Sequence, residues 1–365
     1  MLPGEGTVHR GLVRAHLSTG AEPSLSGRPY AAHPAPMDNR LQALAGEQAG
    51  AFSSTQALAR GVDPLELRAA LRRGEVVRVR RGAYVARGAW DAADQDGRYL
   101  LTALATVHTR PGDALSHHAA LAAHGLPLFG HDPTRVDVVS NVRQTVNRCG
   151  LWVHPVSGAG VVERLGVVVV RPARAIVRTA LSVGRDCAVV AGDAALQRGL
   201  VTLEDLLAEV ALLTPHQGRG RALDVVLAMD ERCESVGESR TRLALTDVGL
   251  RPESQVVITD DSGAFVARVD FVVDGVVVEF DGRVKYGRRR DAADANGDPG
   301  RDAGEAVWLE KRREDAIRRR GHPVERVIWR DLDRPARIGN RVRAARQLVS
   351  PAVLDPATRR AVATP

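Results

Sequence analysis

Long apolar runs are missing from this 365-residue sequence. The longest, such as the four valines at 167–170, end at Arg or Pro, whereas a membrane-spanning helix needs about 20 apolar residues. Cysteine is also scarce, and Cys149, Cys187 and Cys233 are odd in number and far apart. Such spacing fits neither a disulfide framework nor a zinc site. We therefore expect a cytoplasmic protein with no membrane partner.

Lysine is nearly absent, because Lys285 and Lys311 are the only lysines among the 51 Lys and Arg residues. A compositional bias of this kind usually reflects codon usage. A retained lysine therefore suggests a position that needs a compact ammonium rather than a planar guanidinium. Both lysines fall in the last third of the chain.

The apolar content of 44% is enough for large cores, and the length suggests two or three domains. Residues 1–39 are expected to be a disordered leader, or an over-extended translation start before Met37, and residues 351–365 a tail. Between them we predict an α+β multidomain fold with domains at 40–90, 91–235 and 236–350.

The first of these domains is basic, with nine Arg against four acidic residues in residues 40–90. Asp63-Pro64-Leu65-Glu66 combines a capping box with proline at the first helical position. A helix is predicted from there to about Arg73, followed by short strands at 76–79 and 83–85. Together with the helix before Gly61, this pattern indicates a winged helix-turn-helix.

Arginines gather on the predicted second helix and wing of this domain. An excess of positive charge suits a surface that contacts DNA phosphates. An ordinary helical hairpin with solvated arginines is the alternative interpretation. The candidate DNA-binding residues are Arg68, Arg72, Arg73, Arg78, Arg80 and Arg81.

Residues 54–61, 71–74 and 78–85 resemble the N-terminal winged-helix domain of the AbiEi family, the antitoxins of bacterial type IV toxin-antitoxin systems. The resemblance implies DNA as a partner, together with a cognate toxin or the operator of the toxin's operon. It continues through residues 115–127 and 171–175, which look architectural.

The middle domain is predicted to be a small mixed α/β unit with strands near 135–139 and 151–154. His117, His118 and His124 suggest a metal site. No carboxylate or cysteine nearby in the sequence completes a ligand spacing. We therefore interpret them as a helix-start pair and a buried histidine.

The third domain contains a hairpin that brings two acids together. Strictly alternating residues 265–273 and 276–280 flank Asp274-Gly275, which is typical of a two-residue turn. Pairing Val273 with Val276 places Asp270 opposite Glu279, with Asp281 on the same side. Facing carboxylates repel unless an ion neutralises them, and Mg²⁺ prefers such oxygen ligands. The alternative is a solvated polar face on which Arg268 screens the acids.

Two flanking helices offer further groups. Glu238 follows Ser235 by three residues, so it is either a third metal ligand or one half of a capping box. The charged helix predicted at 305–320 carries Lys311, which either pairs with Glu314 or Asp315 or points at the carboxylates.

Residues 236–333 resemble the restriction-endonuclease-like, or PD-(D/E)XK, superfamily, and in particular its very-short-patch-repair-like branch. The likeness rests on Glu238, residues 268–271, 278–282, 285–286, 308–315 and 326–332. It implies an α/β domain with a central mixed sheet, and metal ligands at Glu238, Asp270 and Glu279. The family's catalytic lysine is missing, because the tripeptide reads Glu279-Phe280-Asp281. Lys311 is our first candidate to replace it, and Lys285 the second.

Two functions follow from these resemblances. One is a DNA-binding protein with a Mg²⁺-dependent endonuclease domain, in an antitoxin-like or genome-defence role. Its metal ligands would be Asp270, Glu279, Asp281 and Glu238. The other is a non-catalytic transcriptional regulator of the antitoxin type, with a degenerate nuclease fold.

Overall fold

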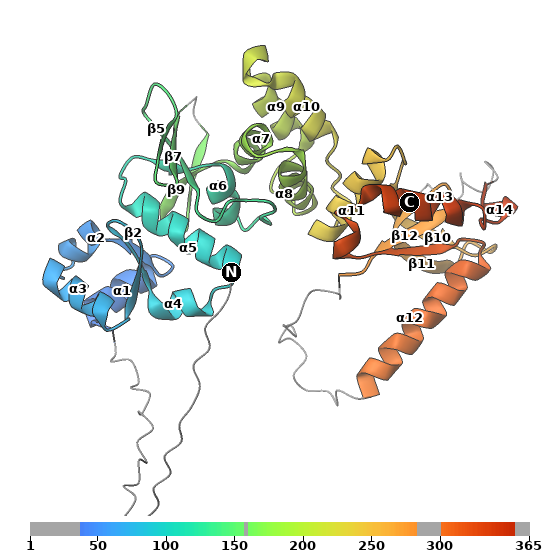
Figure 1. Cartoon of the computed structure of the whole chain (residues 1–365), viewed down its shortest axis with the longest axis horizontal. Helices are drawn as coiled ribbons and strands as arrows, with labels where there is room; N and C mark the ends of the chain where they lie inside the picture. Colours follow the sequence, from blue (N-terminus) through green and yellow to red (C-terminus); the bar gives the residue numbers. More distant parts are fainter. Residues whose placement is uncertain (1–36, 157–159, 283–300, 355–365) are drawn as a thin grey trace, which may run out of the picture. The chain divides into compact units, whose positions relative to one another are not determined.

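The computed structural model describes residues 37–156, 160–282 and 301–354. Its strands form three sheets of three, six and four strands, with helices between them (Figure 1). The expectations for the leader before Met37, for Lys285 and for the end of the tail lie outside these residues. None of the described helices has both the length and the apolar character needed to cross a membrane.

Three helices and three strands make up the N-terminal part. They are α1 (Asn39–Glu47), β1 (Ala51–Ser53), α2 (Ser54–Ala59), α3 (Pro64–Arg72), β2 (Val76–Arg80) and β3 (Ala83–Ala86). The β2–β3 hairpin is the predicted wing, and β1 is an additional strand that pairs with β3. The helix, turn, helix and wing expected from the sequence are all present.

Two helices connect this sheet to the middle of the chain, α4 (Arg87–Ala92) and α5 (Gln95–His108). α4 continues across residues 90 and 91, where the sequence suggested a boundary. α5 contacts all three strands of the N-terminal sheet and also a strand of the next one, β5 (Val136–Ser140). One helix therefore supplies core residues to both parts.

The middle part has a six-stranded sheet in the order β6-β7-β5-β4-β9-β8. Its other elements are β4 (Ala114–Leu115), α6 (His117–Ala123), β6 (Val146–Arg148), β7 (Leu151–Pro155), β8 (Val161–Arg164), β9 (Val167–Val170), α7 (Pro172–Ser182), α8 (Arg185–Gln197), α9 (Leu203–Ala211), the 3₁₀ turn η1 (Pro215–Gln217) and α10 (Arg219–Leu227). The mixed α/β character expected from the sequence is confirmed, and α6 begins at the histidine pair interpreted as a helix start, although β4, β6, β8, β9 and α8 were not predicted.

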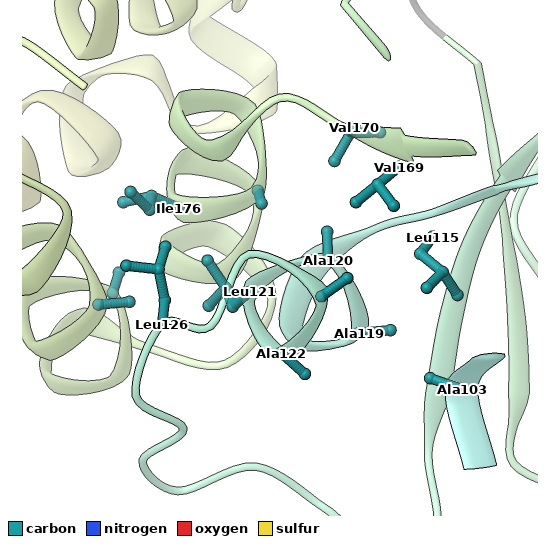
Figure 2. Packing of buried hydrophobic residues seen from close by; sticks show 14 of the residues in the cluster. Ala103, Leu115, Ala119, Ala120, Leu121, Ala122, Leu126, Val169, Val170 and Ile176 are labelled. Atoms are coloured by element: carbon teal, nitrogen blue, oxygen red, sulfur yellow. The ribbon is translucent and has the colours of Figure 1, made fainter. Parts of the chain in front are cut away.

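Small apolar residues dominate the core of this middle part. Figure 2 shows Ala119, Ala120 and Leu121 of α6 beside Val169 of β9 and Ile176 of α7. These five side chains are fully buried. Alanine on α6 permits close approach of the helix to its neighbours, because its side chain fills little space.

The C-terminal part has a four-stranded sheet in the order β10-β11-β12-β13. Its elements are α11 (Val236–Asp247), β10 (Glu253–Thr259), β11 (Phe265–Val273), β12 (Val276–Phe280), α12 (Arg301–Arg319), β13 (Val324–Val327), η2 (Trp329–Asp331), α13 (Pro335–Arg346) and α14 (Pro351–Leu354). β10, β11 and β12 are antiparallel, whereas β12 and β13 are parallel. The central mixed sheet expected from the sequence is confirmed.

Helices that precede the four strands in the sequence, and helices that follow them or lie between them, cover this sheet. α11 and α13 contact β12, and their Leu245 and Ile338 are fully buried in one cluster with Phe271. α12 contacts β11 and β13, and its Ile317 is fully buried in a second cluster with Val277. α12 therefore covers β11, the strand that carries Asp270.

Candidate functional site

The C-terminal hairpin has the register that the sequence predicts. Val273 pairs with Val276 and Phe271 with Val278. Asp274 and Gly275 both have positive φ, 49° and 86°, as a type I′ turn requires. Extending this register by one residue brings Asp270 level with Glu279.

Four carboxylates line one cavity beside this hairpin, three from the hairpin and its end and one from α12. The cavity has a volume of about 200 Å³ and is lined by Asp270, Glu279, Phe280, Asp281, Glu310, Arg313 and Arg326. The backbone N–H of Phe280 donates to Asp270 Oδ2 at 2.8 Å. This bond fixes the Asp270 side chain against β12, the strand that carries Glu279.

The environment of Asp270 disfavours its ionised form. Burial raises the pKa of the Asp270 carboxyl to about 6, and the neighbouring Glu238 and Glu279 carboxylates add to the effect, against the Phe280 N–H bond and Arg313. A perturbed carboxyl in a cavity is a common feature of functional sites.

Arg313 is the cation that α12 presents to the acids. Its Nη2 donates to Glu279 Oε1 at 2.6 Å and to the Arg268 carbonyl at 2.8 Å. Lys311 is exposed and does not line the cavity. The choice of Lys311 as the cation aimed at the carboxylates is therefore corrected to Arg313, because a two-residue step turns a helix by about 200°.

The sheet-facing side of α12 follows helical spacing. Glu310 and Glu314 both accept from Arg326 Nη2 of β13, at 2.7 and 2.9 Å, and Ile317 is buried. The sequence analysis missed Arg313 and Arg326. The spacing of Glu310, Arg313, Glu314 and Ile317 at i, i+3, i+4 and i+7 is the signal that identifies this side.

Glu238 serves the start of α11. Its carboxylate accepts from the Ser235 hydroxyl at 2.7 Å, from the Glu234 N–H at 3.0 Å and from Gln255 Nε2 at 2.9 Å. It is 8% exposed and does not line the cavity. Ser235 caps α11 by accepting from the Glu238 N–H at 3.1 Å, whereas the Glu238 carboxylate accepts from the Glu234 N–H instead of the Ser235 N–H that a full capping box requires. The metal-ligand role of Glu238 stays a prediction.

Gly237, the neighbour of Glu238, allows the acidic strand to approach α11. A Cβ atom at Gly237 would lie 1.9 Å from Cε1 of Phe280. The Phe280 ring also meets Trp329 edge-on, with 5.0 Å between ring centroids. The ring between Glu279 and Asp281 is therefore held in place by α11 and η2.

The second candidate surface is α3, which begins as the sequence predicts. Asp63 caps it by accepting from the Leu65 and Glu66 N–H groups, and Glu66 closes the capping box. Leu67 and Ala70 are buried, whereas Arg68 and Arg72 are exposed. The helix therefore turns these arginines outward.

Arg80, on the wing, has a different environment from the one predicted. Its guanidinium donates to the carbonyls of Thr134 and Cys149, both at 2.7 Å, and of Gly150 at 3.1 Å. Burial lowers the pKa of Arg80. Its predicted DNA contact is therefore corrected to a structural one, because three carbonyl acceptors already hold the group.

The other five arginines of this set are exposed. Arg73 forms an ion pair with the buried Glu75. Across the part of the chain that the structure describes, no hydrogen bond or ion pair engages the guanidinium groups of Arg68, Arg72, Arg78 and Arg81. Exposed cations without acidic partners are suited to an anionic ligand.

The N-terminal elements correspond to a known family. Residues 39–87 match the family described as "Transcriptional regulator, AbiEi antitoxin". The match extends from α1 through β3 and ends at the first residue of α4. A search of curated proteins gives no match to the chain.

The AbiEi match contains α1 to β3 and, among the predicted DNA-binding residues, Arg68, Arg72, Arg78 and Arg81. It therefore supports a role as a DNA-binding regulator or antitoxin. The match does not extend to the carboxylate cavity at Asp270 and Glu279, so the chemistry of that cavity has to be argued from its geometry.

Proposed function

We propose that this chain is a DNA-binding transcriptional regulator of the antitoxin type. The observation that carries this proposal is the set of outward, unpartnered arginines on α3 and the wing. α3 is the second helix of the helix-turn-helix, the element that usually enters the major groove. DNA upstream of its own gene and a cognate toxin are the expected partners.

Replacing Arg68 and Arg72 together with glutamine is expected to weaken DNA binding at least about tenfold. If each contacts one phosphate, the slope of log K against log salt concentration falls in magnitude by about 2. The measurement is fluorescence anisotropy with a labelled duplex over a range of NaCl concentrations. Duplexes from the upstream region and of random sequence separate specific from non-specific binding.

The matched control removes the same charge elsewhere. Arg318 and Arg346 are exposed but are paired with Glu314 and Asp274. Replacing both with glutamine is expected to leave the salt slope nearly unchanged. Equal loss of affinity in the two double variants would show that net charge, rather than α3, governs binding.

Hydrolysis of DNA at the carboxylate cavity is the second candidate function. The observation favouring it is that Asp270, Glu279 and Asp281 line one cavity. The Phe280 N–H binds one oxygen of Asp270 and Arg313 binds one oxygen of Glu279, and oxygen ligands are those Mg²⁺ prefers. These three residues would hold the ion, which would supply positive charge beside a phosphodiester.

In this proposal the protein's own groups set the geometry of the cavity. The Phe280 N–H orients Asp270, and Arg313 orients Glu279 through a 2.6 Å ion pair. Asp281 occupies the tripeptide position that the superfamily gives to lysine, and Arg313 is a cation next to the acids from α12 instead. Glu238 is left out of the ligand set because Ser235, the Glu234 N–H and Gln255 already donate to its carboxylate.

Incubation of the full chain with supercoiled plasmid and Mg²⁺ tests this function. The wild type is expected to nick or cut the plasmid, and Asp270→Ala to lower the rate at least about 100-fold. Arg318→Gln is the active control. Cleavage by the Asp270 variant at the wild-type rate would reveal a contaminating nuclease. If the wild type does not cleave, the hydrolysis proposal fails and only the DNA-binding regulator proposal stands.

A further inference from the structure

A second group of metal-binding side chains lies in the middle part of the chain, away from the carboxylate cavity. His117 is the first residue of α6, Asp137 lies on β5 and His154 on β7. Each offers one ligand atom, and these atoms all lie within 4.8 Å of one another. The sequence analysis found no carboxylate near His117 because the fold supplies one from a different strand.

The separations suit a metal with short bonds to nitrogen and oxygen. Asp137 Oδ1 lies 2.7 Å from His154 Nε2 and 3.9 Å from His117 Nδ1. Ligands about 2.0–2.1 Å from a tetrahedral ion stand about 3.4 Å apart. The two separations that involve Asp137 therefore differ from that spacing by less than about 1 Å, and the ligand atoms of His117 and His154 lie within 4.8 Å of each other.

His117 has two features that its place in α6 does not explain. Its φ is 48°, in the left-handed region that non-glycine residues rarely adopt. Its side chain is buried, and Nδ1 has no hydrogen-bond partner in the structure. Backbone strain and an orphaned buried nitrogen each cost about 1 kcal/mol or more, and a bound ion would offset the second cost.

We infer that His117, Asp137 and His154 bind a divalent transition-metal ion of the Zn²⁺ class. Two imidazoles and one carboxylate favour Zn²⁺, Co²⁺ or Ni²⁺ over Mg²⁺, which prefers oxygen ligands throughout. The inference is independent of the proposed DNA binding and of the Mg²⁺ chemistry at Asp270.

Neighbouring groups can support the ligands from outside. Thr145 Oγ1 lies 3.3 Å from His154 Nδ1, so the ring proton can move to Nδ1 and leave Nε2 for the ion. Arg135 donates to both oxygens of Asp137, from Nη2 to Oδ1 at 2.6 Å and from Nε to Oδ2 at 2.9 Å, so an ion bound through Oδ1 takes the place of the Nη2 bond while the Nε bond still holds Oδ2. The Arg135 guanidinium itself stacks over Trp152, 4.1 Å from the ring centroid.

A cavity beside Asp137 gives room for a fourth ligand. Its volume is about 430 Å³, and Tyr99, His118 and Trp152 are among the residues that line it. The Tyr99 hydroxyl and His118 Nε2 are buried and have no hydrogen-bond partner in the structure. Three protein ligands and an open fourth position are the arrangement of zinc sites that bind water or a small ligand.

Titration of the EDTA-treated full chain with ZnCl₂ and CoCl₂ tests this inference. All proteins in this experiment carry Asp270→Asn, so that the carboxylate cavity does not contribute to the metal binding that is measured. We expect one Zn²⁺ per chain by calorimetry, and visible Co²⁺ absorption bands of a low-coordinate site. His154→Gln is expected to weaken binding by about a hundredfold or more, because loss of even an outer partner costs about 10- to 100-fold.

His216→Gln is the matched control, because His216 is exposed on η1. It is expected to bind Zn²⁺ like its parent. A second measurement uses the parent protein and needs no further variant. Diethyl pyrocarbonate modifies accessible histidines, and Zn²⁺ is expected to protect His154, but not His216, from this modification. Equal binding by both variants, absence of protection, or no binding at millimolar Zn²⁺ would overturn the inference.

Discussion

Replacing Arg242 with methionine is expected to lower the free energy of unfolding by about 3 to 5 kcal/mol. Arg242 of α11 is 8% exposed, and Asp193 of α8 is 1% exposed. Their side chains meet at 2.9 Å from Nη2 to Oδ2. Removing the cation leaves a buried carboxylate without its counter-charge, which is among the most destabilising changes a protein can receive.

The guanidinium of Arg242 also holds the connection between these helices. It donates from Nη1 to the Ala228 carbonyl at 2.7 Å and from Nε to Cys233 Sγ at 3.3 Å. Asp193 in turn accepts from the Asp230 N–H at 2.8 Å. The pair therefore fixes the segment after α10 as well as the contact of α8 with α11.

The same two helices provide a matched control. Arg185 of α8 and Asp247 of α11 form a bidentate pair at 2.6 and 2.7 Å, but their side chains are 38% and 39% exposed. Arg185→Met is expected to cost about 1 kcal/mol or less, because exposed pairs contribute little. Urea unfolding, followed by circular dichroism, measures both variants.

A second change separates the loss of charge balance from the loss of packing. Asp193→Asn keeps an acceptor for the Asp230 N–H and removes the buried charge. Added to Arg242→Met, it is expected to restore part of the lost stability. Equal midpoints for Arg242→Met and Arg185→Met would show that burial does not distinguish the two pairs.

The parts of the fold that the sequence predicted are governed by neighbouring residues. The capping box of Asp63 and Glu66 fixes the start of α3, and Asp274-Gly275 fixes the hairpin turn. Once the turn is known, the alternation of side chains determines which residues face each other. The meeting of Asp270 and Glu279 at one cavity follows from that local rule.

The parts that sequence reasoning missed depend on contacts between distant segments. The acceptors of Arg80 come from residues 54 to 70 positions further along the chain. Asp137 and His154 reach His117 only through the pairing of β4, β5 and β7. No periodicity within one segment reports such a contact, so these sites become visible only in the folded chain.

For α12, helical spacing in the sequence identifies the residue that faces the acids, but the amino-acid composition favoured a different residue. The rarity of lysine directed attention to Lys311, whereas helical spacing relative to Ile317 places Arg313 toward the sheet. Burial of Ile317 fixes the rotation of α12. The position of an apolar residue was therefore a better guide to the site than the identity of the cation.

Asp270→Asn is expected to stabilise the protein at pH 7.5 by about 2 kcal/mol and to have little effect at pH 4. The folded-state pKa of Asp270, about 6, lies above the ordinary value of 3.8. The folded chain therefore holds this proton more tightly than the unfolded chain, and stability is lost as pH rises from about 4 through about 6. Asparagine removes that loss and still accepts from the Phe280 N–H.

Asp274→Asn is the control, because Asp274 is exposed in the turn of the same hairpin. Its effect on the melting temperature is expected to be the same at both pH values. Millimolar Mg²⁺ adds a second comparison, since an ion held by Asp270 stabilises the wild type and not Asp270→Asn. If Asp270→Asn shifts the melting temperature equally at pH 4 and pH 7.5, Asp270 ionises in the folded protein as it does in water.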